Sequence, residues 1–218
     1  KEAGLNVIYT PLNGTGNIPV RTVLERAGFK NVSVVKEQEM PDGNFPTCPY
    51  PNPEIKQVFE CGLEMTKSKK ADLLLATDPD CDRIGIAVLH NNEYTLLSGN
   101  DVGVLFAEYM LSARKAKGTL PDRTLMTKSF VSTSLINKVA EKYGCTVVDV
   151  LTGFKYVGEF ISNLEKTGDE HRFILGFEES YGYLIGTHAR DKDGVAASLM
   201  VCEMAAYYKS QGKTLVDA

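Results

Sequence analysis

The chain has 218 residues, of which 43% are hydrophobic and 24% are charged, and its formal net charge at pH 7 is -4. This length and composition are those of an ordinary globular protein of one or two domains. The small negative charge gives no electrostatic reason to expect nucleic acid or membrane as a partner. No apolar run could span a bilayer and no signal peptide opens the chain, so we expect a cytoplasmic protein.

Apolar runs alternate with amphipathic helical patterns in the first half, which indicates α/β units. A glycine-rich loop, residues 10–17, could cradle a phosphate, but it completes neither phosphate-binding motif, so we favour a structural turn. Residues 41–53 are rich in proline and are not expected to form a helix interior or a central strand. The expected strands are residues 5–9, 31–35, 72–75, 84–89 and 93–97, and the expected helices include residues 20–27, 55–63 and 102–110.

The same alternation restarts in the second half. Residues 115–123 are polar and contain both Gly and Pro after a helix, which favours a domain boundary there. We therefore predict two α/β domains of similar architecture, residues 1–116 and residues 117–218, although no clear sequence repeat relates them. The expected strands are residues 124–127, 145–150 and 173–175, and the expected helices are residues 135–143, capped by Ser132, 155–164 and 195–208.

Three aspartates, Asp78, Asp80 and Asp82, stand at alternate positions between two apolar runs. If this segment is extended, their carboxylates point to the same side and repel one another unless a cation or protons neutralise them. Magnesium prefers carboxylate oxygens and leaves positions for a substrate phosphate. We therefore predict a Mg²⁺ site here, with the Arg83 guanidinium beside it to hold phosphate oxygens.

Two other motifs do not fit this acidic segment. An EF-hand loop requires Gly where Arg83 stands and a bidentate Glu where Leu89 stands. A phosphatase of the DxD type has Thr or Val where Asp82 stands. A solvated acidic turn between two strands stays open, but three charges at the ends of core strands favour a functional role.

A second polar cluster follows the strand at residues 173–175. Glu178, Glu179 and Ser180 come at the carboxyl end of that strand, where α/β sheets usually bind ligands. A charged segment, residues 190–194, precedes the last apolar helix. Each cluster alone also fits solvent-facing charges, with Asp193 or a neighbour as a helix cap.

Together these segments resemble the alpha-D-phosphohexomutases, the superfamily of phosphoglucomutase and phosphomannomutase. The resemblance covers essentially the whole chain but only the second and third domains of the family. It implies two three-layer α/β/α domains with mixed sheets. The motifs that carry it are Asp78-Pro79-Asp80-Cys81-Asp82-Arg83, Gly176-Phe177-Glu178-Glu179-Ser180, Thr152-Gly153-Phe154-Lys155 and the segment around Lys192.

The resemblance also implies a role for each matching position. The three aspartates would hold Mg²⁺, and the arginine after them would face the active site. Two positions of the second motif would contact sugar hydroxyls, the third motif would line the substrate cleft, and a lysine would be a candidate acid and base. The residues are Asp78, Asp80 and Asp82 for the metal, Arg83 and Lys192 for catalysis, and Thr152, Gly153, Lys155, Glu178 and Ser180 for the substrate.

The departures from the family pattern are equally informative. The loop that carries the catalytic serine in the first domain and the phosphate-binding loop of the fourth domain do not occur in these residues. We therefore expect a central piece of a four-domain protein, inactive without domains I and IV of the same chain. Gly182 stands where the phosphomannomutase branch has a histidine, so the chain resembles the phosphoglucomutase branch more closely.

The expected reaction of the intact protein is the interconversion of glucose 1-phosphate and glucose 6-phosphate through a phosphoserine and a bisphosphate intermediate. The expected cofactors are Mg²⁺ and glucose 1,6-bisphosphate as activator, and the expected ligand is a phosphosugar. The alternatives are a phosphomannomutase, a phosphopentomutase or another phosphohexomutase, and a non-catalytic module that binds sugar phosphates.

Overall fold

The computed structural model describes residues 4–218, which form two compact units. Unit 1 contains the chain up to Leu97 together with Gly194–Ala218, and unit 2 contains Ser98–Asp193. The predicted boundary between residues 116 and 117 thus lies inside unit 2. The physical reason is that the helix ending at residue 116 packs on a helix and a strand of unit 2.

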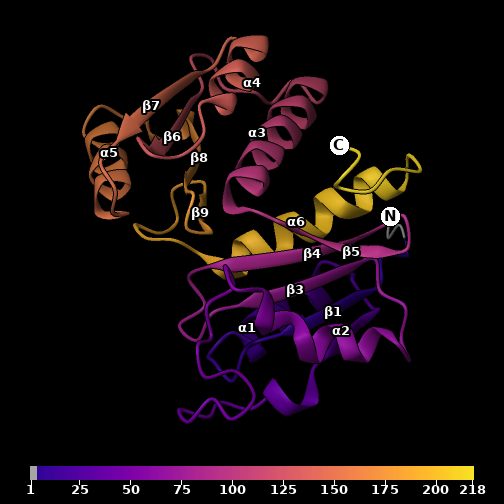
Figure 1. The fold of residues 1–218 in the computed structure, drawn as a ribbon. Helices are drawn as coiled ribbons and strands as arrows, with labels where there is room; N and C mark the ends of the chain where they lie inside the picture. Colours follow the sequence, from indigo (N-terminus) through magenta and orange to yellow (C-terminus); the bar gives the residue numbers. More distant parts are fainter. Residues whose placement is uncertain (1–3) are drawn as a thin grey trace. The chain divides into compact units, whose positions relative to one another are not determined.

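Unit 1 contains a five-stranded mixed sheet with the order β2-β1-β3-β4-β5 (Figure 1). β1, β2 and β3 are parallel, whereas β4 runs antiparallel to both β3 and β5. Asn91 and Asn92, both with positive φ, make the predicted tight turn between β4 and β5. The strands are β1 (Val7–Thr10), β2 (Val32–Val34), β3 (Leu73–Thr77), β4 (Ile84–His90) and β5 (Glu93–Leu97).

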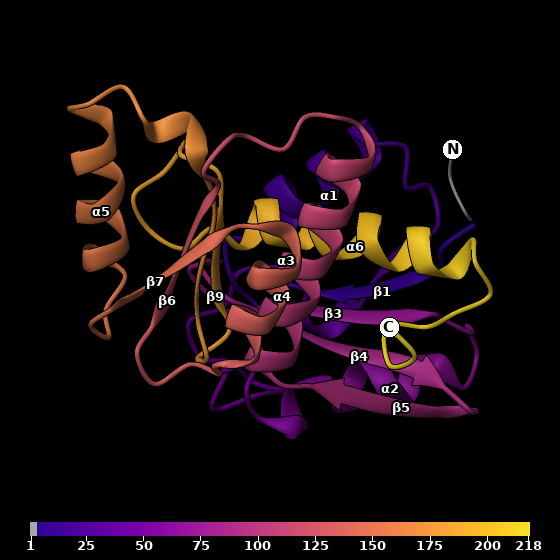
Figure 2. The ribbon, with the colours of Figure 1, turned by 90° about the horizontal axis from the view of Figure 1, so that it is seen from above.

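Helices cover both faces of this sheet, because successive strand residues point to opposite sides. On one face α1 and α6 lie side by side (Figure 2), and Leu73 lines a small cavity together with Ala205 of α6. On the other face Leu74 packs on Gly62 of α2, where an added Cβ would lie 3.2 Å from the leucine. Unit 1 is therefore a three-layer α/β/α domain. Its helices are α1 (Asn17–Arg26), α2 (Glu60–Thr66) and α6 (Gly194–Lys209), with the short turns η1 (Lys36–Gln38) and η2 (Lys56–Phe59).

Unit 2 repeats this arrangement with a four-stranded sheet of order β7-β6-β8-β9. β6, β7 and β8 are parallel and β9 is antiparallel to β8. Each sheet thus has three adjacent parallel strands and then an antiparallel strand, β4 in unit 1 and β9 in unit 2, which confirms the predicted fold class of α/β domains with mixed sheets. The strands are β6 (Leu125–Ser129), β7 (Thr146–Val150), β8 (Phe173–Glu178) and β9 (Gly182–Ile185).

The helices of unit 2 also lie on both faces of its sheet (Figure 1). On one face Tyr183 of β9 packs edge to face on Phe106 of α3, with ring centroids 5.1 Å apart. On the other face Leu184 belongs to a buried cluster with Val157 and Ile161 of α5. The helices are α3 (Gly99–Ala116), α4 (Leu135–Tyr143) and α5 (Lys155–Glu165), with the short turn η3 (Glu170–Arg172).

The predicted helix cap at Ser132 is wrong. The residue before α4 is Ser134, and its side chain makes no capping hydrogen bond. Ser132 is buried, and its hydroxyl contacts a glutamate of the β8–β9 turn instead. A serine a few residues before an apolar helical pattern is the usual signature of a cap, so the sequence alone could not separate the two roles.

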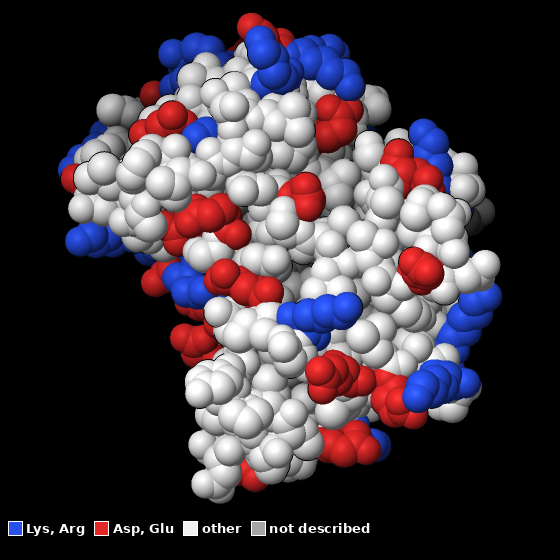
Figure 3. Space-filling model, viewed as in Figure 1, with Lys and Arg blue, Asp and Glu red and all other residues white. Residues whose placement is uncertain are grey.

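No single sign of charge dominates the face shown in Figure 3. Acidic and basic side chains are interspersed there, with uncharged areas between them. Among residues 4–218, the helices are all too short or too polar to cross a bilayer.

Candidate functional site

The three predicted metal ligands converge in unit 1. Each of Asp78, Asp80 and Asp82 offers a carboxylate oxygen, and these oxygens lie within 4.8 Å of one another. The segment is a turn and not the extended strand assumed above: the Cys81 N–H donates to the Asp78 carbonyl (3.0 Å), and Cys81 has a φ of 59°. The turn, placed after β3, therefore brings the carboxylates together. An all-carboxylate donor set fits a hard divalent cation such as Mg²⁺.

Asp78 anchors this turn and is the most buried of the three aspartates. Its Oδ1 accepts hydrogen bonds from the backbone N–H groups of Asp82 (3.1 Å) and Arg83 (2.9 Å). Burial, with the charges of Asp82 and Asp80 adding to it, raises the pKa of the Asp78 carboxyl to about 7. The cluster thus holds more negative charge than it can stabilise by itself, which is the electrostatic condition for binding a cation.

The glycine-rich loop packs on the aspartate turn and donates hydrogen bonds to it. The Thr15 N–H and hydroxyl both donate to the Pro79 carbonyl, at 2.8 and 3.0 Å. A Cβ on Gly14 would lie 2.3 Å from the Cα of Pro79, so only glycine allows this approach. The contact agrees with the interpretation of residues 10–17 as a structural turn.

Arg83 is held by carboxylates of its own unit. Its Nη1 lies 3.1 Å from Glu54 Oε1, and its Nε lies 3.7 Å from Asp82 Oδ1 and 4.0 Å from Asp78 Oδ2. About a third of the side chain is exposed (34%). The guanidinium is therefore beside the aspartate turn, as predicted, and accessible to an anion.

In unit 2 the structure brings together two of the predicted substrate residues. The Gly153 N–H donates to Glu178 Oε1 at 2.6 Å. Glu178 is buried at the end of β8, whereas Gly153 has a φ of 115° in the loop before α5. One oxygen of the Glu178 carboxylate thus fixes the neighbouring loop, while the other can accept from a ligand hydroxyl.

Lys192 lies beside the same loop. Its Nζ is 3.0 Å from Asp191 Oδ1 and 5.5 Å from the centre of the Phe154 ring, and only 13% of its side chain is exposed. Although partial burial alone would raise the pKa of Asp191, the hydrogen bonds from Lys192 hold that pKa below its ordinary value. Gly182 provides the space, since a Cβ there would lie 2.1 Å from Lys192 Cδ. The Lys192 side chain thus occupies space that a side chain at position 182 would otherwise take.

The remaining predicted substrate residues are more open. Thr152 and Lys155 are exposed, and Ser180 is half-buried in the β8–β9 turn. The Lys155 ammonium lies 5.0 Å from the ring centre of Tyr156. These side chains are accessible to a ligand but are not fixed by the contacts that hold Glu178 and Lys192.

Unit 2 also contains a buried lysine that was not predicted from the sequence. Lys128, at the end of β6, is 3% exposed. Its Nζ lies 3.0 Å from Asp149 Oδ1 and donates to the carbonyls of Ser129 (3.3 Å) and Ser132 (3.2 Å). A lysine at the end of an otherwise uncharged strand was the available signal, because a buried charge requires partners.

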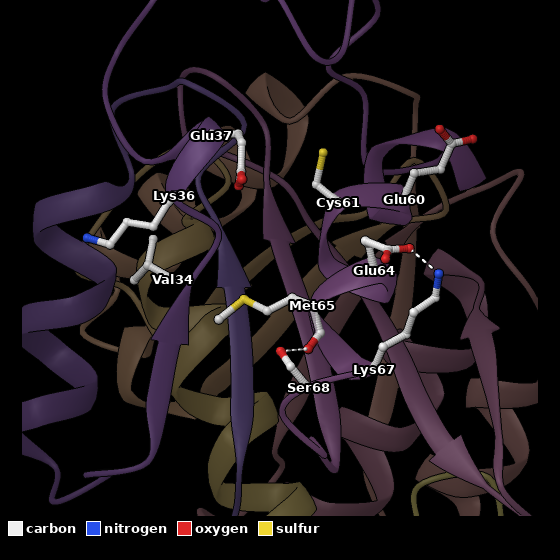
Figure 4. A pocket seen from close by; sticks show the side chains of 9 residues that line it. All are labelled: Val34, Lys36, Glu37, Glu60, Cys61, Glu64, Met65, Lys67 and Ser68. Carbon is white, nitrogen blue, oxygen red and sulfur yellow. Dashed lines mark hydrogen bonds and ion pairs between the residues drawn. The ribbon is translucent and has the colours of Figure 1, made fainter.

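A broad hollow in unit 1, of about 820 Å³, contains none of the predicted site residues (Figure 4). It is lined by β2, η1 and α2, with Met65 and Val34 among its apolar side chains. Its acidic and basic residues are mixed, and Lys67 pairs with Glu64. Pocket size therefore does not locate the chemistry in this chain.

Family comparisons match both halves of the chain. Residues 1–91 match the alpha/beta/alpha domain II of phosphoglucomutase/phosphomannomutase, and residues 98–218 match domain III. The chain belongs to the phosphoglucomutase/phosphomannomutase family. The domain III match of this family extends through α6, which in the structure packs on α1, β3 and β4 of unit 1.

Relatives named phosphoglucomutase and relatives named phosphomannomutase have similar sequence identity to this chain. The chain is 34% identical over 218 residues to a phosphoglucomutase of Staphylococcus haemolyticus (strain JCSC1435), which matches 100% of this chain and 38% of the relative. It is 35% identical over 214 residues to a phosphomannomutase of Mycoplasma genitalium (strain ATCC 33530 / DSM 19775 / NCTC 10195 / G37), at 98% and 38% coverage. The chain thus spans well under half the length of these family members.

The fold is shared with solved structures. A phosphoglucomutase/phosphomannomutase family protein from Burkholderia thailandensis superposes with a TM-score of 0.72, at 20% identity, over 93% of this chain and 40% of that chain. At this identity the comparison supports the fold alone.

Proposed function

We propose that the intact protein is a phosphoglucomutase and that this chain supplies its metal-binding and sugar-binding residues. The observation that carries the proposal is the convergence of Asp78, Asp80 and Asp82 within 4.8 Å, in a family of mutases. Phosphoryl transfer requires charge neutralisation and positioning more than covalent participation of the protein. The two sets of residues described above suit those two tasks.

The aspartate turn would hold the metal. Asp78, Asp80 and Asp82 offer oxygen ligands to Mg²⁺, which when bound supplies the positive charge that stabilises a transferring phosphoryl group. Arg83, accessible beside them, would clamp phosphate oxygens in a forked geometry. Its nearest carboxylate partner, Glu54, is exposed (37%), so an anionic phosphate could compete with it.

The β8–β9 turn would hold the sugar. Glu178 and Ser180 would hydrogen-bond ring hydroxyls, and Thr152, Gly153 and Lys155 would line the same site. Because both orientations of a hexose bisphosphate present hydroxyls to these groups, one site can accept either phosphosugar. This explains how binding and reorientation can use the same residues.

Lys192 would move the proton of the reacting hydroxyl. Its ammonium is largely buried against Phe154 and Asp191, so its position is defined before the ligand binds. Gly182 leaves this place to the lysine, which favours the glucose-specific branch over the branch that carries histidine there.

The other parts of the reaction would come from outside this chain. A phosphoserine of domain I would transfer its phosphoryl group to glucose 1-phosphate, and domain IV would bind the opposite phosphate. Glucose 1,6-bisphosphate would be both the intermediate and the activator, and the 218-residue chain alone would be inactive. We expect the reaction to take place in the cytoplasm.

The second candidate is a phosphomannomutase, which the 35% identity to the Mycoplasma genitalium relative favours. A substrate panel on the intact protein separates the candidates: glucose, mannose, glucosamine and ribose 1-phosphates, each with Mg²⁺ and the matching bisphosphate. We expect turnover of glucose 1-phosphate to exceed the others. Faster turnover of mannose 1-phosphate would replace the proposal by the second candidate, and binding without any turnover would identify a non-catalytic module.

A further inference from the structure

The second glutamate of the β8–β9 turn points into unit 2. Glu179 lies between Glu178 and Ser180, but its Oε2 accepts hydrogen bonds from the hydroxyls of Ser129 (2.7 Å) and Ser132 (3.1 Å). The backbone N–H of Glu179 donates to the same Ser132 hydroxyl at 3.0 Å. The residue is therefore tied by both its side chain and its backbone to the segment that follows β6.

The serines in these contacts are buried, whereas Glu179 is half-buried. Ser129 is 0% exposed and Ser132 is 5% exposed, and their hydroxyls lie 2.7 Å apart. Hydrogen bonds to an ionised carboxylate in such surroundings are stronger than bonds between neutral groups. Removal of either partner leaves a polar group without the hydrogen bond that its burial requires.

The segment that carries the serines is itself fixed. Lys128 donates from inside to the carbonyls of Ser129 and Ser132, and the Ser132 N–H closes a turn onto the Ser129 carbonyl at 3.0 Å. The next residue, Thr133, donates its N–H to Asn100 Oδ1 of α3 (2.9 Å). The serines therefore form a rigid anchor for the glutamate.

The β8–β9 turn needs such an anchor. Tyr181 has a φ of 68°, a left-handed conformation that a residue with a side chain adopts at a cost. The Glu179 carbonyl packs so closely on Gly99 that an added Cβ there would lie 2.1 Å from its oxygen. Without external contacts, a three-residue connection of this kind would sample other conformations.

We propose that Glu179, Ser129 and Ser132 form a positioning clamp that holds residues 178–182 in the conformation that binds the phosphosugar. Glu179 acts through Glu178 and Ser180 and does not itself contact the sugar. This inference rests on the proposed function, because it assigns a role to the support of the proposed sugar site.

The test is the affinity of the intact protein for glucose 1-phosphate, measured by NMR titration, with thermal melting and Mg²⁺ affinity recorded for each variant. Ser132→Ala and Glu179→Ala should weaken phosphosugar binding by about tenfold. Glu179→Gln should stay within about threefold, because the amide oxygen still accepts from both serines. Ser134→Ala is the matched control, since that hydroxyl does not cap α4. Mg²⁺ affinity should be unchanged throughout.

Each outcome decides the proposal. Equal losses in Glu179→Gln and Glu179→Ala would mean that the negative charge, and not acceptance of the two serine hydrogen bonds, sets the affinity, which overturns the positioning role. Unchanged affinity in folded Ser132→Ala and Glu179→Ala would make the contacts purely structural and also overturn it. If Ser132→Ala does not fold, the two Glu179 variants still decide. Absence of glucose 1-phosphate binding in the unmodified intact protein is a different pattern, which counts against the proposed function itself.

Discussion

Gly182→Ala should displace Lys192, the proposed acid and base, and leave its amino group chemically unchanged. The added methyl carbon would lie 2.1 Å from Lys192 Cδ and 2.8 Å from Lys192 Cγ, whereas ordinary contacts begin near 3.4 Å. The lysine side chain must therefore move by more than about 1 Å. Such a misplacement of a catalytic group costs about a hundredfold in turnover.

The effect on folding should be small by comparison. The atoms in conflict belong to a flexible side chain, and Gly182 needs no left-handed backbone conformation. We expect the free energy of unfolding to fall by less than about 1 kcal/mol. Gly43→Ala is the matched control, because an added Cβ there meets no atom within 4 Å.

The assay is turnover of glucose 1-phosphate by the intact protein, paired with thermal unfolding of each variant. Turnover reduced about a hundredfold in Gly182→Ala, with unfolding close to that of Gly43→Ala, supports the placement of Lys192. Unchanged turnover would refute the argument that the lysine position matters. A large loss of stability would show that the backbone moves to relieve the contact, and not the Lys192 side chain, which would also refute the argument.

Three further predictions follow from particular contacts. Lys192→Ala should lower turnover by about a hundredfold or more with little change in the Michaelis constant, and steady-state kinetics showing the reverse would make it a binding residue. The melting temperature of the metal-free chain should fall as the pH rises from about 4 to about 7, because in this range Asp78, with a pKa of about 7 in the folded chain, binds more protons folded than unfolded. Saturating Mg²⁺ should remove this dependence on pH. A melting temperature that rises over this range without metal would contradict the burial of Asp78. Tyr183→Phe should reduce the free energy of unfolding by about 1 kcal/mol in chemical denaturation, because it removes the hydrogen bond from the buried hydroxyl to the Gly99 carbonyl (3.0 Å); an unchanged value would show that this bond contributes nothing net.

The alternation of apolar runs and helical patterns was sufficient to predict the α/β fold, because strand and helix periods are properties of local sequence. It was not sufficient for the division into units. α6 is apolar around most of its circumference, so its sequence does not indicate which sheet it covers. Its return to unit 1 is set by tertiary packing on α1, β3 and β4.

The convergence of the three aspartates was predicted, but the structure gives a different reason for it. The aspartates converge because Cys81 turns the chain, and not because the segment is extended. β9 was not predicted, since the polar residues before it obscured a four-residue strand. The contact of Glu179 with Ser129 and Ser132 joins residues about fifty positions apart, and no local pattern reports a contact of that separation.

The most direct test of the proposed function is Mg²⁺-dependent turnover of glucose 1-phosphate by the intact protein and its Asp80→Asn variant. Asp122→Asn, a change at an exposed acid of the loop before β6, is the control. The proposal predicts a loss of at least about a hundredfold for Asp80→Asn, as for other electrostatic catalytic groups, and none for the control. Unchanged turnover in Asp80→Asn at saturating Mg²⁺ would contradict the assignment of the aspartate turn as the catalytic metal site.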